Sequence, residues 1–465
     1  MEKTLIINEK DNVAIALEPM GDIPRGHKLA LCDIPKGTYV IKYGQIIGCA
    51  TEDIAKGAWV HTHNLRSHLN EESAYTYDFH AEVPTPQSAT FWGYRRKNRR
   101  AGIRNEIYII PTVGCVNDVC IRLARAAEAY KCGSVDGIYA LTHQFGCSQL
   151  GEDGESIKRL LCGIARNPNA SYVLFVGLGC ENNRLSDIEM ALSDCDHISF
   201  FNCQDVEDEH AYGLAILHDF IQRASALSRE ELPLSELCIG LKCGGSDAFS
   251  GITANPLVGR ITDRVIACGA SAILTEVPEM FGAEQLLMNK CKTVEIFSRY
   301  KAMIEDFKAF YTEEGFPVYE NPSPGNKDGG ITTLEEKSLG CIEKAGSSAI
   351  VDVLAYAEPC TLAGVSVLDA PGNDLIPATA LAASGAQLVL FTTGRGTPFS
   401  TFVPTLKIST SRALAEKKRA WIDFDASTMD EAGLLTRIIE TASGNYICKS
   451  EDVREIAFFK KGVTL

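Results

Sequence analysis

The stretch LCIGLKCGG, residues 237–245, is an apolar run that stops at a cysteine followed by two glycines. A short apolar run that ends in a glycine-rich loop is typical of a buried strand in a parallel sheet. The same pattern occurs at 105–115, 134–147, 171–180, 270–279, 363–372 and 386–396. Amphipathic segments such as 119–130 and 156–167 lie between these runs and predict helices. This alternation predicts an α/β fold with parallel sheets.

The first part of the chain has a different pattern. Runs of β-forming residues at 28–34, 38–50 and 57–64 are separated by PKG and AKG turns, which predicts a small all-β domain. The segment that follows is rich in proline and basic residues and is typical of a linker. We therefore expect four parts: a β domain at 1–75, a linker at 76–103, a first α/β domain at 104–235 and a second, catalytic α/β domain at 236–465.

Composition narrows the class of protein. The net charge of −15 over 465 residues argues against a nucleic-acid partner, which usually meets a basic face. No signal-peptide core and no run of membrane-spanning length is found, so we expect a cytoplasmic protein without a membrane partner. The 17 cysteines are odd in number and lack framework spacing, which favours free thiols. Most are expected to be buried small residues, except those on polar loops.

One basic cluster interrupts this acidic chain. It consists of Arg95, Arg96, Lys97, Arg99 and Arg100. A nucleic-acid patch is disfavoured by the overall charge. A solvated surface, or a site for an anionic substrate or a neighbouring subunit, is the stronger prediction.

Cysteines at strand ends are the first candidate site. Ligands of open parallel sheets bind outside the carboxyl ends of the strands. Cys147, Cys180 and Cys243 each follow such a strand and stand beside a glycine, which lets backbone approach a ligand closely. Three thiolates from separate strands are able to hold iron, or a cluster with one iron open to substrate. The alternative is that they are small residues packed near a site that they do not serve.

The stretch WVHTHN, residues 59–64, is the second candidate. In a strand, His61 and His63 point to the same face, so both imidazoles are able to bind one metal, or one binds metal while the other moves a proton. Asn64 beside them is a candidate for hydrogen-bonding a substrate hydroxyl.

Two further loops have anion-binding character. The stretch at 321–340 is a loop rich in proline and glycine that leads into a helix capped by Thr332 or Thr333, with Glu335 or Glu336 near the third helical position. A helix N-terminus favours anions such as carboxylates. Arg395 lies between two glycines and is suited to clamp a carboxylate. Ordinary loop and cap chemistry is the alternative for both.

Together these motifs resemble the altronate/galactarate dehydratase family, which also includes sulfolactate sulfo-lyase. The matching stretches are KGAWVHTHN, THQFGC, GLGCEN, KCGGSDAFSGITANP, LTEVPEMFGAE, NPSPGNKDGGITTLEEKSLG and FTTGRG, within about residues 10–425. The resemblance implies an N-terminal SAF-like (β-clip) domain and a large α/β portion. It also implies a hydro-lyase that takes water from D-altronate, galactarate or a related sugar acid and leaves a 2-keto-3-deoxy acid. Family members are generally iron-dependent, so Fe²⁺ is expected, with Mn²⁺ or an iron–sulfur cluster as alternatives.

Under this hypothesis the metal lies among His63, Cys147, Cys180 and Cys243. The candidate proton-transfer residues are His61, His143, Glu181 and Lys242. The candidate substrate contacts are Asn64, Arg104, Ser246, Asp247, Asn255 and Arg395. Arg104 and Asn105 match the family, but GYRRKNRRAG, DAPGND and GRGTPFS depart from it, so the identity of the sugar acid stays open. A homodimer is expected. A sulfolactate sulfo-lyase and a non-catalytic sugar-acid sensor are the alternative functions.

Overall fold

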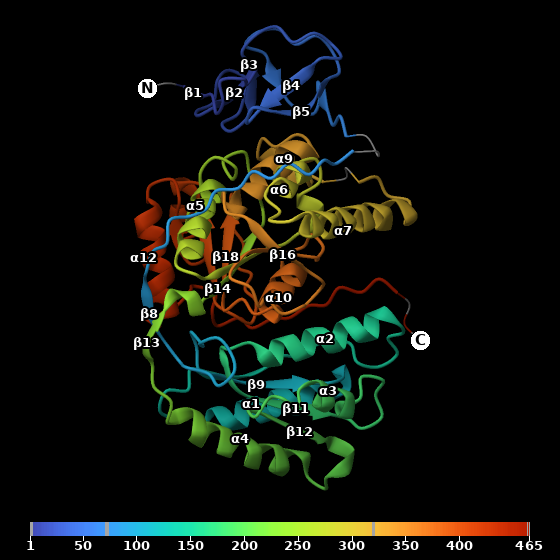
Figure 1. The fold of residues 1–465 in the computed structure, drawn as a ribbon, viewed down its shortest axis with the longest axis vertical. Helices are drawn as coiled ribbons and strands as arrows, with labels where there is room; N and C mark the ends of the chain where they lie inside the picture. Colours follow the sequence, from blue (N-terminus) through green and yellow to red (C-terminus); the bar gives the residue numbers. More distant parts are fainter. Residues whose placement is uncertain (1–2, 70–73, 319–320, 463, 465) are drawn as a thin grey trace.

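A computed structural model describes residues 3–69, 74–318, 321–462 and 464. Three parts follow one another along the long axis of the molecule (Figure 1). A small β domain lies at one end, an α/β part with a seven-stranded sheet lies in the middle, and an α/β part with a four-stranded sheet lies at the other end. The predicted fold class, a small β domain followed by α/β parts with parallel sheets, is confirmed.

The β domain contains two small antiparallel sheets, ordered β1-β2-β3-β6 and β4-β5-β7. Its strands are β1 (Thr4–Leu5), β2 (Val13–Ala16), β3 (Lys28–Ala30), β4 (Tyr39–Lys42), β5 (Gln45–Ala50), β6 (Trp59–Val60) and β7 (Leu65–Arg66). Val13, Val40, Ile47 and Val60 are buried members of its hydrophobic core. The strands are short, so the domain has a small core and a large share of turns.

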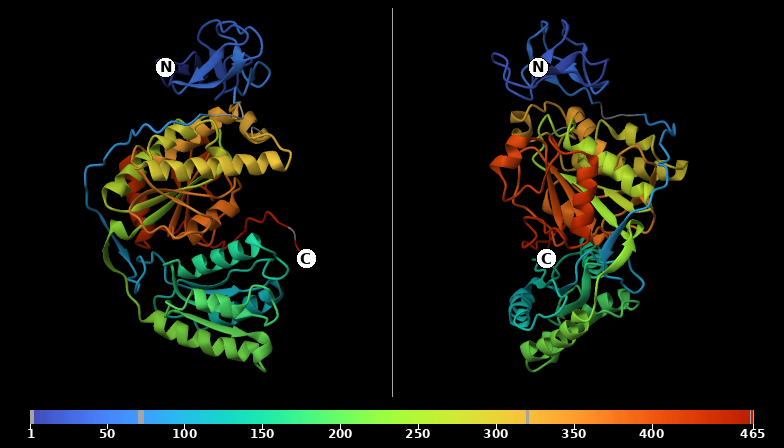
Figure 2. Two further views of the ribbon diagram at one scale, coloured as in Figure 1. Left: turned by 45° about the vertical axis from the view of Figure 1, so that its right-hand side comes forward. Right: turned by 90° about the vertical axis from the view of Figure 1, so that its left-hand side faces the viewer.

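The chain passes the middle part before it enters the far one. Residues 74–89 run along the seven-stranded part, where His80 N donates to Asn289 O at 2.6 Å and Gln87 N donates to Ala267 O at 2.9 Å. Strand β8 (Thr90–Gly93) leads the chain into the four-stranded part. It pairs antiparallel with β13 (Glu230–Pro233), which leads the chain back to the seven-stranded part. Figure 2 shows these two strands side by side between the two α/β parts.

The basic cluster at 95–100 lies at this junction. Arg96 is buried and donates to the carbonyl oxygens of Pro168 and Arg104, both at 2.9 Å, and Arg100 donates to Ser271 Oγ at 2.8 Å. The other three members pair with exposed acids or with carbonyl oxygens, in the contacts Arg95–Glu230, Lys97–Asp196 and Arg99–Ala170. The N–H groups of these side chains bond to other residues of the same chain, because a buried guanidinium needs hydrogen-bond partners. The cluster therefore stabilises the junction.

The first α/β part has a parallel sheet with strand order β10-β9-β11-β12. Helices α1 and α4 cover one face, with Leu123 and Phe220 in their core, and α2 and α3 cover the other, with Leu160 and Ile188. The elements are β9 (Glu106–Pro111), η1 (Gly114–Val116), α1 (Asn117–Glu128), β10 (Gly137–Ala140), α2 (Glu152–Arg166), β11 (Ala170–Gly177), α3 (Leu185–Ala191), β12 (Ile198–Asn202), η2 (Cys203–Asp205) and α4 (Glu209–Ser225).

The second α/β part has a parallel sheet with strand order β16-β17-β15-β14-β18-β19-β20. Its elements are η3 (Leu234–Glu236), β14 (Cys238–Cys243), α5 (Ala254–Ala267), β15 (Ser271–Leu274), η4 (Val277–Glu279), α6 (Glu284–Met288), α7 (Val294–Glu313), α8 (Pro324–Asp328), α9 (Leu334–Ile342), η5 (Glu343–Ala345), β16 (Ile350–Leu354), β17 (Gly364–Leu368), α10 (Leu375–Ala383), β18 (Leu388–Thr393), β19 (Thr405–Ser409), α11 (Arg412–Lys417), β20 (Phe424–Asp425) and α12 (Glu431–Ala442). The strand order reverses between β14 and β18, which is where open sheets bind ligands.

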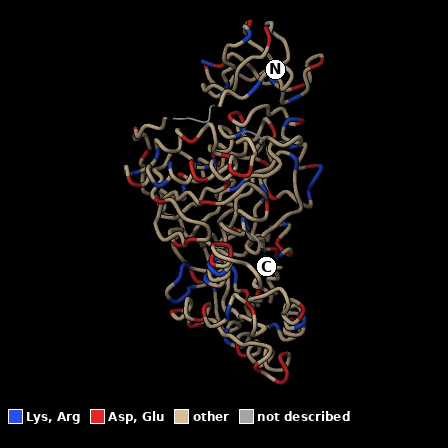
Figure 3. Tube along the Cα trace, turned by 90° about the vertical axis from the view of Figure 1, so that its right-hand side faces the viewer, with Lys and Arg blue, Asp and Glu red and all other residues tan. Residues whose placement is uncertain are grey.

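Close helix packing joins the two α/β parts. Helix α2 of the first lies on α10 of the second, and a side chain at Gly163 would approach Ala383 O to 2.5 Å. Acidic and basic residues are interspersed in all three parts of the molecule (Figure 3). Among the helices of the described residues, none combines the length and apolarity that a membrane span requires.

Candidate active site

Cys243 ends strand β14, next to the point where the strand order reverses, and is only 1% exposed. Its Sγ lies 3.4 Å from Cys341 Sγ on α9 and 3.0 Å from Glu279 Oε2 at the end of η4. These three residues form the one group of at least three possible metal ligands within 4.8 Å of one another in the described part of the chain. We call them the Cys243 centre.

Two lysines complete the Cys243 centre. Lys337 and Cys341 are four positions apart on α9 and share a face of that helix, and Lys344 follows in η5. Lys344 Nζ lies 3.0 Å from Cys243 Sγ, and Lys337 Nζ lies 2.9 Å from Glu279 Oε1. Each buried charge therefore faces an opposite one.

These contacts make Cys243 the acidic thiol of the pair. A hydrogen bond from Cys341, together with the charges of Lys344 and Lys242, lowers the pKa of Cys243 to about 7. The same hydrogen bond and burial raise the pKa of Cys341. Burial alone would raise the pKa of Glu279, but the charges of the neighbouring lysines outweigh it and hold that pKa far below its usual value. The centre thus places a thiol of lowered pKa in contact with a carboxylate.

A second ion pair lies directly beside the centre. Lys242 Nζ is fully buried and contacts Glu276 Oε1 at 2.7 Å and Asp374 Oδ1 at 3.3 Å. Glu276 has a left-handed backbone, with φ of 70°, which costs free energy for a residue with a side chain. Burial and the charge of Glu279 raise the pKa of Glu276, against the charge of Lys242. Strained residues of this kind concentrate at functional sites.

A pocket of about 390 Å³ opens on these groups. It lies at the carboxyl ends of β14, β15 and β17, and polar and apolar atoms share its wall about equally. The lining includes Cys243, Glu276, Glu279, Asn321, Ser323, Asn326, Lys337, Asn373 and Asp374. This chemistry suits a small, polar ligand better than an apolar one.

Sequence reasoning missed Lys337, Cys341 and Lys344. The prediction of an irregular loop over 321–330 is wrong at α8 (Pro324–Asp328), because a proline at the first helical position starts a helix instead of breaking one. The start of α9 was predicted, but the helix was not followed to Cys341. Thr333 caps α9, as one of the two predicted caps, and its side chain accepts from Glu336 N. The spacing Lys337, Cys341 and Lys344 was a usable signal, since it places a thiol between two cations on one side of a helix.

Comparison with known proteins decides the family. The chain is 46% identical to "Altronate dehydratase" of Bacillus subtilis (strain 168) over an alignment of 497 positions that covers 100% of both chains. It is also 46% identical to "Altronate dehydratase" of Escherichia coli (strain K12), with 99% of both chains covered. The chain belongs to the altronate/galactarate dehydratase family.

Family models and a third relative agree with this assignment. The models describe the altronate/galactarate dehydratase SAF domain at 19–68, the second domain of D-galactarate dehydratase/altronate hydrolase at 93–225, and the C-terminal part of D-galactarate/altronate dehydratase at 234–464. "Galactarate dehydratase (L-threo-forming)" of Escherichia coli (strain K12) is 33% identical, over 94% of this chain and 92% of that one. The β domain is thus the family's SAF domain.

The histidines of the SAF domain do not lie as a strand would place them. Strand β6 ends at Val60, and His61 to Asn64 form a turn, so the expected strand geometry for His61 and His63 is wrong. His61 stacks on Trp59 with ring centroids 5.3 Å apart, and burial together with the charge of Lys28 lowers its pKa to about 4. His63 is exposed. Asn64 uses its side chain to close the turn, with bonds to His61 N and Trp59 O, both at 2.9 Å.

His143 and Glu181 lie in the first α/β part and hold loops there. His143 Nε2 contacts Pro111 O at 2.7 Å and its Nδ1 accepts from Phe145 N at 3.2 Å, while burial lowers its pKa to about 4. Glu181 accepts from Thr112 Oγ1 and from Gly179 N. Burial alone would raise the pKa of Glu181, but these hydrogen bonds lower it below its usual value.

The predicted metal ligands are distributed over all three parts of the molecule. His63 lies in the SAF domain, Cys147 and Cys180 follow β10 and β11 of the four-stranded sheet, and Cys243 ends β14 of the seven-stranded sheet. Within the described residues they do not form a group with ligand atoms within 4.8 Å. Cys243 is the member that the structure brings into the candidate site.

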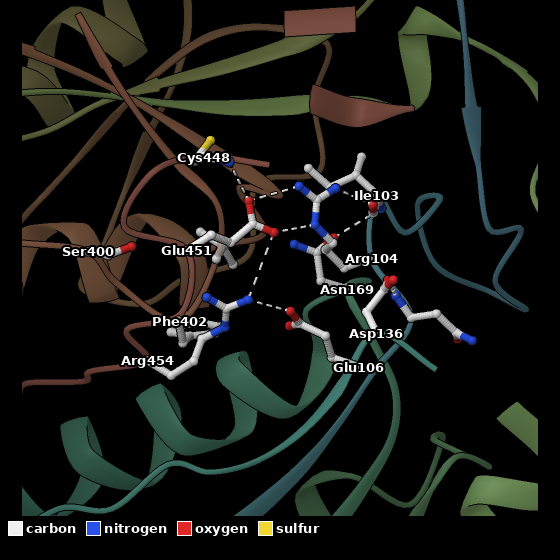
Figure 4. Close-up of polar contacts among 12 residues, drawn as sticks. Ile103, Arg104, Glu106, Asp136, Asn169, Ser400, Phe402, Cys448, Glu451 and Arg454 are labelled. Carbon is white, nitrogen blue, oxygen red and sulfur yellow. Dashed lines mark hydrogen bonds and ion pairs between the residues drawn. The ribbon is translucent and has the colours of Figure 1, made fainter. Parts of the chain in front are cut away.

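Arg104 joins the first α/β part to the C-terminal segment. It is buried and forms a two-point ion pair with Glu451, whose second contact, Nη2 to Oε2, is 2.9 Å. Arg454 continues the chain of charges to Glu106 on β9 at 2.6 Å (Figure 4). The predicted substrate contact thus has a structural partner, and it is not in the lining of the pocket beside Cys243.

The remaining predicted contacts shape the loop after Cys243. Ser246 O accepts from Asn326 Nδ2 at 2.8 Å, which ties this loop to α8. Asp247 accepts from Thr410 Oγ1 at 3.1 Å, and burial raises its pKa. Buried Asn255 donates to Gly340 O at 2.7 Å in α9, and the more accessible Arg395 donates to Gly325 O at 3.2 Å.

Proposed function

We propose that the protein is a hydro-lyase that removes water from D-altronate and leaves a 2-keto-3-deoxy acid. The observation that carries the proposal is the Cys243 centre, two sulfurs and a carboxylate, which opens on a pocket at the switch point of the larger sheet. Full-length identity of 46% to two altronate dehydratases, against 33% to a galactarate dehydratase, favours altronate over galactarate as the substrate.

Dehydration of a sugar acid needs two kinds of help. The proton at C2 is only weakly acidic, and its removal places a second negative charge beside the carboxylate. The hydroxide that leaves C3 is a poor leaving group and needs a proton or a cation. Lys337, which lines the pocket and contacts Glu279, is the proposed source of positive charge for this step.

The donors of the Cys243 centre fit a thiophilic divalent ion. Cys243 Sγ and Glu279 Oε2 lie 3.0 Å apart, and Cys341 adds a second sulfur. Lys344 and Lys337 contact these donors in the structure, and a bound ion would take the place of one or both ammonium groups. Two sulfur donors favour Fe²⁺ over Mn²⁺, which prefers oxygen ligands. Cys243, Glu279 and Cys341 would therefore hold Fe²⁺. When bound, the ion would polarise the substrate as a Lewis acid.

Glu276 is the proposed proton-transfer group. Its carboxylate lines the pocket, and the ion pair with Lys242 holds it in place, so Lys242 acts as a positioning residue. Asn321, Ser323 and Asn326 in the same wall are the proposed partners of substrate hydroxyls. Arg395 stays a proposal for the carboxylate.

His61, His63 and the other predicted residues that lie outside this pocket keep their roles only as predictions of the sequence. A homodimer and a cytoplasmic location also stay predictions.

The test uses enzyme purified without oxygen and supplied with Fe²⁺. D-altronate is expected to give a 2-keto-3-deoxy acid, and Glu276→Gln and Cys243→Ser are each expected to lower kcat about 10²- to 10⁴-fold. The matched control is Glu295→Gln, at an exposed position in the first turn of α7, which should keep full turnover. Sulfite released from sulfolactate alone would replace the proposal with a sulfo-lyase. No turnover on any acid by iron-loaded enzyme would favour a sensor.

A further inference from the structure

Exposed cysteines gather at one edge of the four-stranded sheet. Five of the cysteines are exposed, although cysteine is among the most often buried residues. Three of these five, Cys115, Cys147 and Cys180, follow the carboxyl ends of β9, β10 and β11. Those strands are neighbours in the order β10-β9-β11. This is the edge at which an open parallel sheet binds its ligand.

Hydrogen bonds tie the three cysteine loops into one unit. Gly114 N, next to Cys115, donates to Phe145 O at 2.9 Å. Ser148 N, next to Cys147, donates to Asn182 Oδ1 at 2.9 Å, and further contacts of the same kind join Asn183 N to Gly146 O and Asn183 Nδ2 to Thr112 O, both at 3.0 Å. Cys115 and Cys147 are thus directly next to residues that bond to another cysteine's loop, and Asn182 and Asn183 lie two and three positions after Cys180.

A glycine precedes each of the three cysteines, and the packing requires it. A side chain at Gly146, where φ is +107°, would approach Thr112 O to 2.1 Å. At Gly179, where φ is +122°, it would approach Gln204 Oε1 to 2.8 Å, and at Gly114 it would approach His143 O to 3.0 Å. The glycines permit the close approach of loops that brings the cysteines to one edge.

A pocket of about 650 Å³ lies at this edge. Its wall includes Cys180, Glu181, Asn182 and Arg184, so it is polar and carries both signs of charge. Of the three cysteines, Cys180 is the one in this wall. Within the described residues these three thiols do not form a group whose ligand atoms all lie within 4.8 Å of one another. In an iron–sulfur cluster each cysteine binds a different iron, so three thiols on separate loops need not converge on one ion.

We propose that Cys115, Cys147 and Cys180 together hold one iron–sulfur cluster, separate from the Cys243 centre. Three thiolates would ligate three irons of a four-iron cluster and leave the fourth open toward the pocket. The proposal separates Cys147 and Cys180 from Cys243 and gives them a third partner, Cys115, on the adjacent strand. It does not depend on the substrate of the enzyme.

The test measures the cluster itself. The full chain is reconstituted without oxygen with Fe²⁺ and sulfide, desalted, and assayed for iron, acid-labile sulfide and visible absorption. We expect about four sulfides per chain, the content of one four-iron cluster. Cys115→Ser, Cys147→Ser and Cys180→Ser should each lose at least half of that sulfide. Cys132→Ser, at an exposed cysteine before the opposite end of β10, and Cys243→Ser should keep it.

Three results would overturn the proposal: wild-type chain without sulfide, iron bound without sulfide, or full sulfide content in all three loop variants. Loss of the cluster in Cys243→Ser would also overturn it, because a single shared site would then be at work. Turnover is not the readout, so a chain that binds the cluster but fails to dehydrate altronate would count against the proposed function alone.

Discussion

At the scale of single residues, several lysines are buried together with a group of opposite charge. Lys28, Lys42, Lys242 and Lys344 are almost fully buried, and each contacts a carboxylate or a thiolate. Removal of one partner from such a pair leaves an uncompensated charge, which costs more than the pair contributes. These lysines therefore have few acceptable substitutes.

His197 carries a prediction of pH dependence. Burial, with the charge of Arg99, lowers its pKa to about 4 from the ordinary value of 6.5. Between pH 4 and pH 6.5 this histidine is therefore mostly protonated in the unfolded chain and mostly neutral in the folded one. The free energy of unfolding falls as the pH drops below about 6.5. At pH 5 the loss from this group is about 2 kcal/mol relative to pH 7.5.

The check is urea unfolding of wild type and His197→Gln at both pH values. Glutamine keeps a donor toward Ala165 O, which His197 Nε2 contacts at 3.1 Å, and does not titrate. The variant should therefore lose about 2 kcal/mol less than wild type on acidification. Equal losses for the two proteins would show that His197 is protonated in the folded state.

At the scale of elements, α9 links two parts of the molecule. Its N-terminus meets the SAF domain, where Thr333 Oγ1 donates to Ile47 O, and its last turn brings Cys341 to Cys243. Its first-turn residues Glu335 and Glu336 are buried. A helix of nine residues does not rest on propensity alone, so its cap and its contacts determine where Cys341 lies.

Thr333→Ala tests this element. It removes the cap to Glu336 N and the bond to Ile47 O, and we expect a loss of about 1–2 kcal/mol in the free energy of unfolding. Thr333→Ser keeps both bonds and should lose much less. Thermal unfolding of both variants measures the difference, and equal losses would assign the effect to the lost methyl group.

At the scale of the whole molecule, a buried triad holds the SAF domain on the larger part. Lys28 and Lys42 of the SAF domain contact Glu336 of α9 at 2.8 and 2.7 Å. Burial alone would raise the pKa of Glu336, but the charges of the two lysines hold it far below its usual value. The SAF domain thus meets the α/β part through charges that neither side can bury alone.

Glu336→Gln should loosen this contact. Two buried ammonium groups would lose their counter-charge, with an expected cost of about 3–5 kcal/mol. The SAF domain should then be cleaved by protease at a concentration that leaves wild type intact. The control is Glu18→Gln, which breaks the exposed pair with Lys3 and should change stability by less than about 1 kcal/mol. Unchanged protease resistance in Glu336→Gln would contradict the role of the triad.

Local sequence was enough to predict the strands of the parallel sheets and the start of α9, but it carried β6 past Val60 and missed α8. Apolar runs and glycine-rich loops predicted the parallel strands, and Thr333 was among the predicted caps, because these features depend on neighbouring residues. Cys243 was recognised as a polar strand end for the same reason. Tertiary structure alone decided its partners: Cys341 is 98 positions away, and Cys147 and Cys180 belong to another sheet. The spacing of residues along a helix or strand determines on which face a side chain lies. The packing of elements that are distant in the sequence determines which residues that face contacts.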